Sequence, residues 1–295
     1  MNLIDDKWIP VRRKNGEKIK IAPWQITEGI GTDNKITELA APRPDFNGAL
    51  IQFLIGLLQT TCTPENPGEW RKWLNEPPTP DELKKRFETV KYAFNLDGDG
   101  PRFMQEVGLI KEKKQNNKTI DEMIIDMPGE QTLKLNKDHF IKRNTIGQLC
   151  PHCSTMALFT LQINAPSGGQ GHLTGLRGGG PLSTLVYGNK IWETAWLNIL
   201  EKSKFENLAN FEKNDDENKF PWLTNNRNSE KGLMTTPEDI HPAQLYWATP
   251  RRIFIKFENS EHQTVCDLCD RVTEQVVKQY CTKPRGINYE GTWRH

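Results

Sequence analysis

The chain has 295 residues, enough for one large domain or two ordinary ones; 36% are hydrophobic and 26% are charged. A mean hydropathy of -0.69 together with nine tryptophans excludes a wholly disordered chain and favours a soluble folded protein. Lysine and arginine number 39 against 38 aspartate and glutamate, so the net charge of +1 excludes a strong overall positive field, and any contact with nucleic acid must be local.

The sequence does not predict a membrane or secreted protein. The longest apolar run, Ala49 to Leu58, is interrupted by Gln52 and Gly56 and is far shorter than the roughly 20 residues of a membrane span. Charged residues at positions 5–7 interrupt the segment where a secretory signal would carry its apolar region. We therefore expect a cytoplasmic protein that does not engage a membrane.

The first predicted elements are a β-hairpin and a buried helix. Residues 8–19 have the pattern of strand, polar turn at Asn15-Gly16 and second strand. Asp45 then precedes a dense apolar stretch that ends near Thr61, which predicts a helix with Asp45 as its N-cap.

A second helix is marked by its start signals. Thr79 can cap it, Pro80 suits the first helical position, and Glu82 lies where a capping box needs it, so we expect a helix to about Lys91. Residues 111–118 lack apolar side chains altogether, and we interpret them as an exposed loop.

The downstream elements alternate between helix, loop and strand. Apolar residues at helical spacing predict helices over 154–163 and 191–202, and alternation predicts a strand over 251–257. Residues 214–219 and 225–231 are expected to be polar loops. Long loops, short strands and separated helices together indicate an irregular α+β fold.

Four of the six cysteines form two identically spaced CxxC pairs, Cys150 with Cys153 and Cys266 with Cys269. Four thiolates offered by two tight turns complete a closed, tetrahedral structural zinc site. The pairs are separated by about 110 residues, far more than in a compact zinc ribbon, so the metal would tie together remote parts of the fold. The predicted cofactor is structural Zn²⁺.

Other uses of these cysteines explain less. A disulfide needs an oxidising compartment, and a thioredoxin-like redox pair leaves the second CxxC unexplained. A catalytic zinc usually keeps an open position, which four cysteines do not leave. His152 could compete as a ligand but is expected to point outward, and Cys62 and Cys281 are expected to be ordinary thiols.

Residues 168–180 contain seven glycines among thirteen residues. Backbone without Cβ atoms can adopt left-handed conformations and can press its amides against a ligand or the wall of a DNA groove. The segment is neither a P-loop nor a dinucleotide-binding fingerprint, so it does not support nucleotide hydrolysis. A flexible connecting loop is the simpler alternative.

These features follow one another in an order that resembles a known family. The ordered set comprises DKWIPV at 6–11, the first CxxC, NAP at 164–166, GLRGG at 175–179, LYW at 245–247 and the second CxxC. In this respect the chain resembles the large subunit of the type I-E CRISPR Cascade complex, the CasA family, over essentially its whole length.

The resemblance implies a function without catalysis. Within an RNA-guided antiviral complex, such a subunit recognises the PAM, the short sequence beside the target, in double-stranded DNA. It does so mainly from the minor groove and helps to recruit a helicase-nuclease, while the guide RNA reads the target. The implied partners are the other Cascade subunits, the guide RNA, the target DNA and the helicase-nuclease.

The resemblance also implies a longer protein. Residues 1–295 would form the N-terminal domain of a Cascade large subunit, with the zinc knuckles at 150–153 and 266–269. A strand-separating wedge and a C-terminal helical bundle follow this domain in the family, and we expect neither within these residues.

Three elements contact DNA in the family, and each has a counterpart here. A loop before the first CxxC corresponds to Phe140, Ile141, Lys142 and Arg143, with His139 as an alternative to Phe140. The glycine loop corresponds to Ser167, Gly168, Gly169, Gln170 and Gly171. A basic finger corresponds to Lys283-Pro284-Arg285, in which Arg285 is preferred to Lys283. The family pattern is richer in glycine and aromatic at its second position, so the resemblance does not specify the preferred PAM. A backbone loop reads groove shape and the degenerate acceptor pattern of A·T pairs, so we expect tolerance of several PAMs.

Two other functions fit parts of the sequence. Asp97 and Asp99 could offer paired carboxylates to a zinc-dependent nuclease or hydrolase, although Asp-Gly-Asp-Gly-Pro is turn chemistry and no histidine-acid constellation accompanies it. The aromatic content would also suit a scaffold that binds protein partners and no DNA. A PAM-bearing duplex distinguishes the three, since a nuclease cuts it, a scaffold ignores it and a PAM reader binds it selectively.

Overall fold

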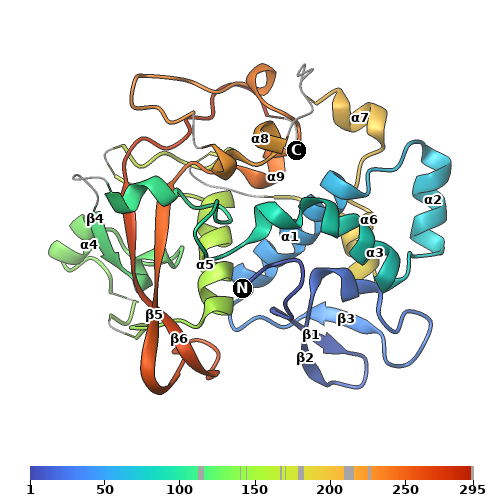
Figure 1. Cartoon of the computed structure of the whole chain (residues 1–295), viewed down its shortest axis with the longest axis horizontal. Coiled ribbons are helices and arrows are strands. Elements are labelled where there is room, and N and C mark those ends of the chain that lie inside the picture. Colours follow the sequence, from blue (N-terminus) through green and yellow to red (C-terminus); the bar gives the residue numbers. More distant parts are fainter. Residues whose placement is uncertain are drawn as a thin grey trace.

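Two helices, α1 (Pro44–Thr61) and α5 (Pro151–Ile163), lie in the middle of the molecule, between a small N-terminal sheet and a long C-terminal hairpin (Figure 1). The computed structural model describes residues 1–111, 116–139, 141–143, 145–166, 168–169, 171–178, 183–208, 216–224 and 227–293. Within these ranges, no helix has both the length and the apolar character needed to cross a membrane. Helices and small antiparallel sheets confirm the expected mixed fold.

The N-terminal sheet contains the predicted hairpin. Strands β1 (Ile9–Arg13) and β2 (Lys18–Ile21) are antiparallel, and β3 (Ile36–Leu39) pairs with the other edge of β1. The turn closes where Gly16 N donates to Arg13 O at 2.9 Å, and Gly16 has a φ of +89°, which glycine adopts without steric cost. The short 3-10 helix Pro23–Thr27 follows the hairpin.

The start of α1 differs from the prediction. Its N-cap is Arg43, with Pro44 at the first helical position, and not Asp45. Proline lacks an N–H and suits that position, so the residue before it becomes the cap. Asp45 lies inside the first turn, where its carboxylate accepts a hydrogen bond from Arg43 Nε at 2.9 Å.

The core is aromatic and is centred on Phe53 of α1. Its ring makes edge-to-face contacts with Trp8, Phe94, Phe159 and Trp247 at centroid distances of 5.2, 6.0, 5.5 and 5.7 Å. Trp247 belongs to the short helix α9 (Gln244–Trp247), whereas Phe159 belongs to α5. A continuous buried cluster therefore joins the N-terminal sheet, α1, α5 and the C-terminal hairpin.

The capping box at Thr79 is confirmed. Thr79 N donates to the carboxylate of Glu82 at 2.7 Å, and Thr79 Oγ1 accepts from Glu82 N at 3.3 Å. This capping box begins α3 (Pro80–Phe87), which follows α2 (Pro67–Asn75). Helix α3 ends earlier than the predicted Lys91 and continues as a 3-10 helix over Glu88–Phe94.

The predicted helix over 191–202 is interrupted. The structure has α6 (Ile191–Trp196) and a separate α7 (Lys202–Glu206). Between α6 and α7, the side chain of Gln59 in α1 forms two hydrogen bonds with the backbone of Leu200. Gln59 Oε1 accepts from Leu200 N at 2.7 Å, and Gln59 Nε2 donates to Leu200 O at 3.0 Å. This long-range pairing replaces the helical hydrogen bonds.

The second sheet has the order β4-β6-β5, with β4 (Asn116–Thr119), β5 (Arg252–Val265) and β6 (Val272–Lys283). The prediction of an exposed loop over 111–118 was wrong in part, since 116–118 pair with β6 through backbone groups that any polar residue carries, and 112–115 lie outside the described residues. The strand predicted over 251–257 continues much further, to Val265.

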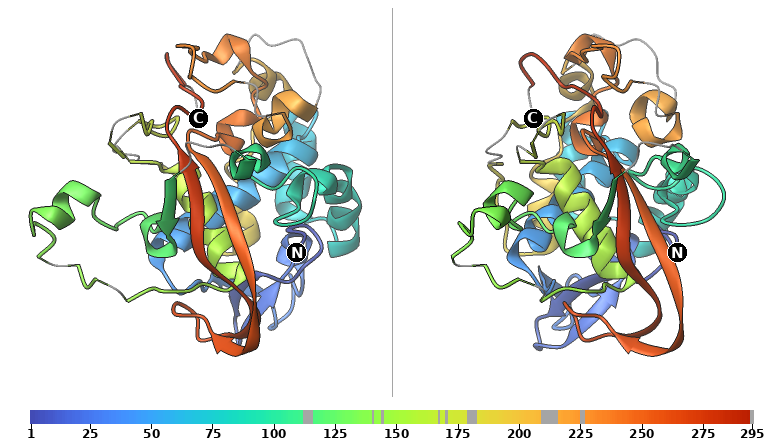
Figure 2. Two further views of the ribbon diagram at one scale, coloured as in Figure 1. Left: turned by 60° about the vertical axis from the view of Figure 1, so that its left-hand side comes forward. Right: turned by 90° about the vertical axis from the view of Figure 1, so that its left-hand side faces the viewer.

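The remaining described elements are single turns of helix. They are α4 (Glu130–Lys134), α8 (Asp216–Lys219) and the 3-10 helices Val107–Lys111, Ile120–Met123, Pro221–Leu223 and Pro237–Asp239. The loop predicted over 214–219 is therefore wrong for the residues of α8, and 227–231 form an irregular loop as expected. Residues 214–215 and 225–226 of these two predictions lie outside the described residues. The segment that carries α4 projects from the body (Figure 2).

Candidate metal centre and nucleic-acid interface

The four paired cysteines converge on one point. Cys150 is the N-cap of α5 and Cys153 lies in its first turn, while Cys266 and Cys269 lie in the turn between β5 and β6. Their sulfur atoms all lie within 4.8 Å of one another, and three of the four side chains are buried. Within the described ranges, this is the one group of histidine, cysteine or acidic side chains arranged to hold a metal.

The sulfur geometry fits a tetrahedral metal and not a disulfide. A Zn–S bond of about 2.3 Å places tetrahedral sulfur atoms about 3.8 Å apart. Cys150 Sγ and Cys269 Sγ are separated by 3.7 Å, and all six cysteines are free thiols. Hydrogen bonds from Cys150 and Cys153 lower the pKa of Cys266, and the bond from Cys150 lowers the pKa of Cys269 to about 7, whereas contacts within the cluster raise the pKa of Cys150 and Cys153. Two of the four thiols therefore ionise more readily than the other two, and a metal would displace the remaining protons on binding.

Backbone contacts hold the two CxxC turns together. Asp267 Oδ2 accepts hydrogen bonds from Gly147 N at 2.7 Å and Gln148 N at 2.8 Å. Leu149 and Val277 exchange backbone hydrogen bonds at 2.9 and 2.8 Å. Residues 147–149, which lead into the first CxxC pair, are thereby hydrogen-bonded to the β5-β6 hairpin. These contacts hold the two cysteine pairs close together without a metal.

His152 was predicted to point outward, and that prediction was wrong. The residue is 8% exposed, and its Nδ1 lies 3.2 Å from Lys20 Nζ and 2.8 Å from Arg271 Nη1. Burial first, and then these two cations, lower the pKa of His152 to about 3. His152 lies outside the four-cysteine group.

The other two cysteines lie apart from the cluster. Cys62 ends α1, and burial raises the pKa of its thiol to about 11. Cys281 is buried in β6 and donates to Asn117 Oδ1 at 3.3 Å. Cys62 is therefore not an activated nucleophile at neutral pH.

The glycine loop (167–171) and the finger (283–285) lie in direct contact. Arg285 N donates to Gly171 O at 2.6 Å. A Cβ atom at Gly171 would lie 2.8 Å from Pro284 Cβ, so glycine permits this approach. Ser167 and Gln170 lie outside the described residues.

A buried arginine underlies the glycine loop. Arg251 is 8% exposed and donates through its guanidinium to Pro166 O, and a Cβ at Gly168 would collide with the same guanidinium. Burial lowers the pKa of Arg251 to about 10, which leaves it charged at neutral pH. Among the described residues no carboxylate pairs with it, and its Nε lacks a hydrogen-bond partner.

The two basic residues of the finger have different surroundings. Lys283 forms an ion pair with Glu230, and its side chain is 20% exposed. Arg285 is exposed and has a φ of +67°, a left-handed conformation that costs a non-glycine residue about 1 kcal/mol. The preference for Arg285 over Lys283 as the available cation is therefore compatible with the structure, although DNA contact by either residue remains a prediction.

The loop before the first CxxC stands apart from these two elements. Phe140 lies outside the described residues, and Lys142 is exposed. Arg143 pairs with Asp138 at 2.5 Å. Ile141, Lys142 and Arg143 make no hydrogen bond or ion pair with the described part of the glycine loop or with the finger, so their assignment to one DNA-binding surface remains a prediction.

α5 and the β5-β6 hairpin connect the two candidate sites. The cysteine cluster joins the start of α5 to the tip of the hairpin, whereas the glycine loop follows the end of α5 and contacts the finger at the hairpin's base. The thirteen residues of α5 separate the sites by about 20 Å. Figure 1 shows this helix and the hairpin side by side.

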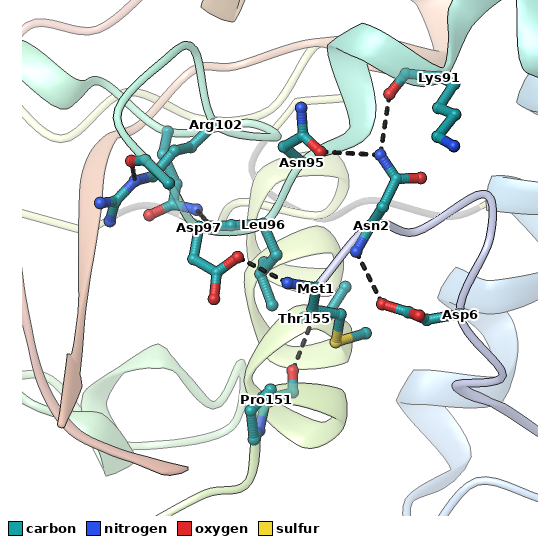
Figure 3. Close-up of polar contacts among 12 residues, drawn as sticks. Met1, Asn2, Asp6, Lys91, Asn95, Leu96, Asp97, Arg102, Pro151 and Thr155 are labelled. Atoms are coloured by element: carbon teal, nitrogen blue, oxygen red, sulfur yellow. Dashed lines mark hydrogen bonds and ion pairs between the residues drawn. The ribbon is translucent and has the colours of Figure 1, made fainter. Parts of the chain in front are cut away.

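The alternative carboxylate site is occupied by internal contacts. Asp97 Oδ1 forms an ion pair with the amino terminus of Met1 at 2.6 Å (Figure 3). Asn2 Nδ2 donates to Asn95 Oδ1 at 2.8 Å beside it. Asp99 is exposed and belongs to no metal-type cluster among the residues that the structure describes. Asp97 therefore binds the first residue of the chain and is not paired with Asp99 as two metal ligands would be.

Sequence reasoning missed two contributors to this surface. The sequence pattern predicts only a strand at Arg251 and a polar loop at Glu230. Their roles arise from neighbours far away in sequence, Pro166 for Arg251 and Lys283 for Glu230. No local sequence signal marks such contacts.

These features define a protein of mixed helices and sheets in which two CxxC segments, distant in sequence, bring four cysteines together in an arrangement that could bind a metal ion. A family model described as CRISPR-associated protein Cse1 matches residues 2–295. The chain therefore belongs to the Cse1 family, and the predicted resemblance to CasA is confirmed.

Solved structures of this family share the fold. Cse1 from Acidimicrobium ferrooxidans is 17% identical with a TM-score of 0.63, and the match covers 98% of this chain and 52% of that chain. Thermobifida fusca Cse1 is 15% identical with a TM-score of 0.62, covering 99% and 52%. Thermus thermophilus CasA (Cse1) is 15% identical with a TM-score of 0.58, covering 100% and 56%. The chain thus spans about half the length of the structures that it matches.

Proposed function

We propose that this chain is the N-terminal part of a Cascade large subunit that recognises the PAM in double-stranded DNA and helps to recruit a helicase-nuclease. The observation that carries the proposal is the hydrogen bond between Arg285 of the finger and Gly171 of the glycine loop. This hydrogen bond places the finger and the glycine loop on one surface, and the resemblance to the family implies that both elements contact DNA. The other Cascade subunits and the guide RNA are the proposed partners.

The chemistry of this surface suits a minor groove. Gly169 is exposed, has a φ of +88° and has open space where a Cβ would lie, so its backbone is accessible. The minor groove presents a degenerate set of acceptors, which backbone amides and a single arginine can read without distinguishing every base. The charge of Arg251 beneath the loop adds a local positive potential that the net charge of +1 does not reveal.

We further propose that the cysteine cluster holds one structural Zn²⁺. Cys150, Cys153, Cys266 and Cys269 would be the ligands, since four soft donors at tetrahedral spacing suit zinc. The metal would hold the hairpin tip against α5. Four cysteine ligands leave no open position for a reacting water.

Replacement of Arg285 with alanine is expected to weaken binding of the assembled guide-RNA complex to a PAM-bearing duplex by about tenfold, which corresponds to loss of one groove contact. Lys283→Ala serves as the control, because Glu230 already holds that side chain, and its effect should be smaller. The measurement is a binding titration on duplexes selected from a library randomised beside the target. Indifference of the unmodified complex to those positions would contradict PAM recognition and favour a scaffold.

The purified chain is expected to cleave neither DNA nor ATP. Asp97 is held by the amino terminus, and the glycine-rich segment lacks phosphate-binding residues. Incubation of the chain with labelled duplex and Mg²⁺, Mn²⁺ or Zn²⁺, and separately with ATP, checks this. Metal-dependent cleavage that disappears in Asp97→Asn or Asp99→Asn would assign the chain to the nucleases instead.

A further inference from the structure

The finger is braced by a segment that the sequence presents as an ordinary polar loop. Ser229 N donates to Arg285 O at 3.2 Å and to Gly286 O at 3.0 Å. Arg285 Nη1 donates to the backbone carbonyl of Glu230 at 3.1 Å. Ser229 and Glu230, which we call the brace, therefore hold Arg285 through backbone groups alone.

The carboxylate of Glu230 acts on a different residue of the finger. It forms ion pairs with Lys283 and with Arg252 Nη1, the latter at 2.5 Å. These two cations hold the pKa of Glu230 below its usual range, so the carboxylate is charged at neutral pH. Arg252 is also paired with Glu106, through distances of 2.5 and 2.7 Å, and keeps that partner if Glu230 changes.

The brace thus makes different contacts with Arg285 and with Lys283, the two cations of the finger. Arg285 is exposed and is held by the backbone in its left-handed conformation, against the glycine loop. Lys283 is paired with a carboxylate at the base of the same finger. An unpaired lysine beside a DNA groove would attract any phosphate and would add affinity without sequence information.

We propose that Glu230 is a positioning residue that holds Lys283 back from DNA phosphate, so that Arg285 is the finger's groove contact. This inference rests on the proposed function of the glycine loop and the finger. The brace would set specificity, because it suppresses contacts that PAM-bearing and PAM-free duplexes offer equally. Substitution of the carboxylate alone leaves the backbone contacts to Arg285 in place.

The first test needs no DNA. Brief reductive methylation of the folded chain, followed by mass spectrometry of its peptides, measures how fast each lysine reacts. Glu230→Gln is expected to increase the rate at Lys283 several-fold. Glu258→Gln is the matched control, since it removes a carboxylate that pairs with another lysine of the same hairpin, Glu258 lying 3.8 Å from Lys278, and it should leave Lys283 unchanged. Equal rates at Lys283 in the unmodified chain and in Glu230→Gln would overturn the proposal.

The second test uses the assembled guide-RNA complex and a PAM-free duplex at 50 to 200 mM salt. One added phosphate contact steepens the slope of log affinity against log salt by about 0.9, so the affinity gained in Glu230→Gln should shrink about 3.5-fold across this range. The gain should disappear in the double variant Glu230→Gln/Lys283→Ala and be absent in Glu258→Gln. As Glu230→Gln gains affinity for PAM-free duplex, its preference for PAM-bearing over PAM-free duplex should decrease.

The outcomes separate this inference from the proposed function. Faster methylation of Lys283 with an unchanged salt slope would mean that the lysine does not reach DNA, and this overturns the inference alone. A lower melting temperature with equal loss of binding to both duplexes would make Glu230 a purely structural residue. Failure of the unmodified complex to prefer a PAM would remove the proposed function, whereas the methylation result would still report on the brace.

Discussion

Replacing Cys153 with serine should remove the bound metal and cost at least about 3 kcal/mol of folding free energy, because a closed metal site stabilises the fold by its own binding energy. For a chain of 295 residues the melting temperature should fall by at least roughly 5 °C. Elemental analysis should find one zinc per unmodified chain and less than one in the variant. A chelator should lower the melting temperature of the unmodified chain and have little further effect on the variant.

Cys281→Ser is the matched control for this experiment. Cys281 is also a buried cysteine of the hairpin, but it lies outside the cluster, and serine can keep the hydrogen bond to Asn117. It should retain full zinc content and lose less stability. Absence of stoichiometric metal from protein purified without chelator, or an unchanged melting temperature in Cys153→Ser, would contradict the zinc site.

The metal should also influence the DNA surface from a distance. The hairpin that carries Cys266 and Cys269 at its tip ends in the finger, and α5 leads from the cluster to the glycine loop. Loss of the metal would release the hairpin tip from the start of α5. The hairpin and α5 would then align the finger and the glycine loop less firmly. Weaker PAM-dependent binding should accompany metal loss in the Cys153→Ser variant.

Substituting leucine for Gly169 should reduce affinity for PAM-bearing duplex by about tenfold to a hundredfold, since a side chain would separate the loop backbone from the groove wall. Binding to PAM-free duplex should change little. The site offers a clean test because a Cβ at Gly169 meets nothing within 4 Å. At Gly171 the added atom would push Pro284 aside, and at Gly168 it would strike Arg251, so a bulky residue at either position would disturb the packing of the loop as well.

Gly31→Leu controls for the backbone cost of the Gly169 variant. Gly31 is exposed, has a φ of +90° and likewise has open space around its Cβ position. Both variants should therefore lose similar stability from left-handed strain, while only Gly169→Leu should lose PAM-dependent binding. Equal losses on both duplexes would mean that the loop holds phosphate, and no loss on either would remove the glycine loop from the site.

The fold was predictable where neighbouring residues decide the structure. The capping box at Thr79 and the turn at Gly16 form within a few residues, so local hydrogen-bonding chemistry identifies them. Strand β4 was not predictable, because its partner β6 begins more than a hundred residues later and the pairing uses backbone groups. The end of α6 was missed for the same reason, since Gln59 of α1 replaces its helical hydrogen bonds.

For the site, the sequence alone determined the chemistry of the parts: two CxxC pairs that suit a soft metal, a glycine-rich backbone that permits close approach, and a basic finger. Tertiary structure decided how those parts act together. It brought the cysteine pairs to one point, set Gly171 against the finger, buried Arg251 beneath the glycine loop and paired Lys283 with Glu230. The physical reason is that a residue's type and spacing specify which bonds it can make, whereas its exposure, charge pairing and steric room depend on neighbours that only the folded chain supplies.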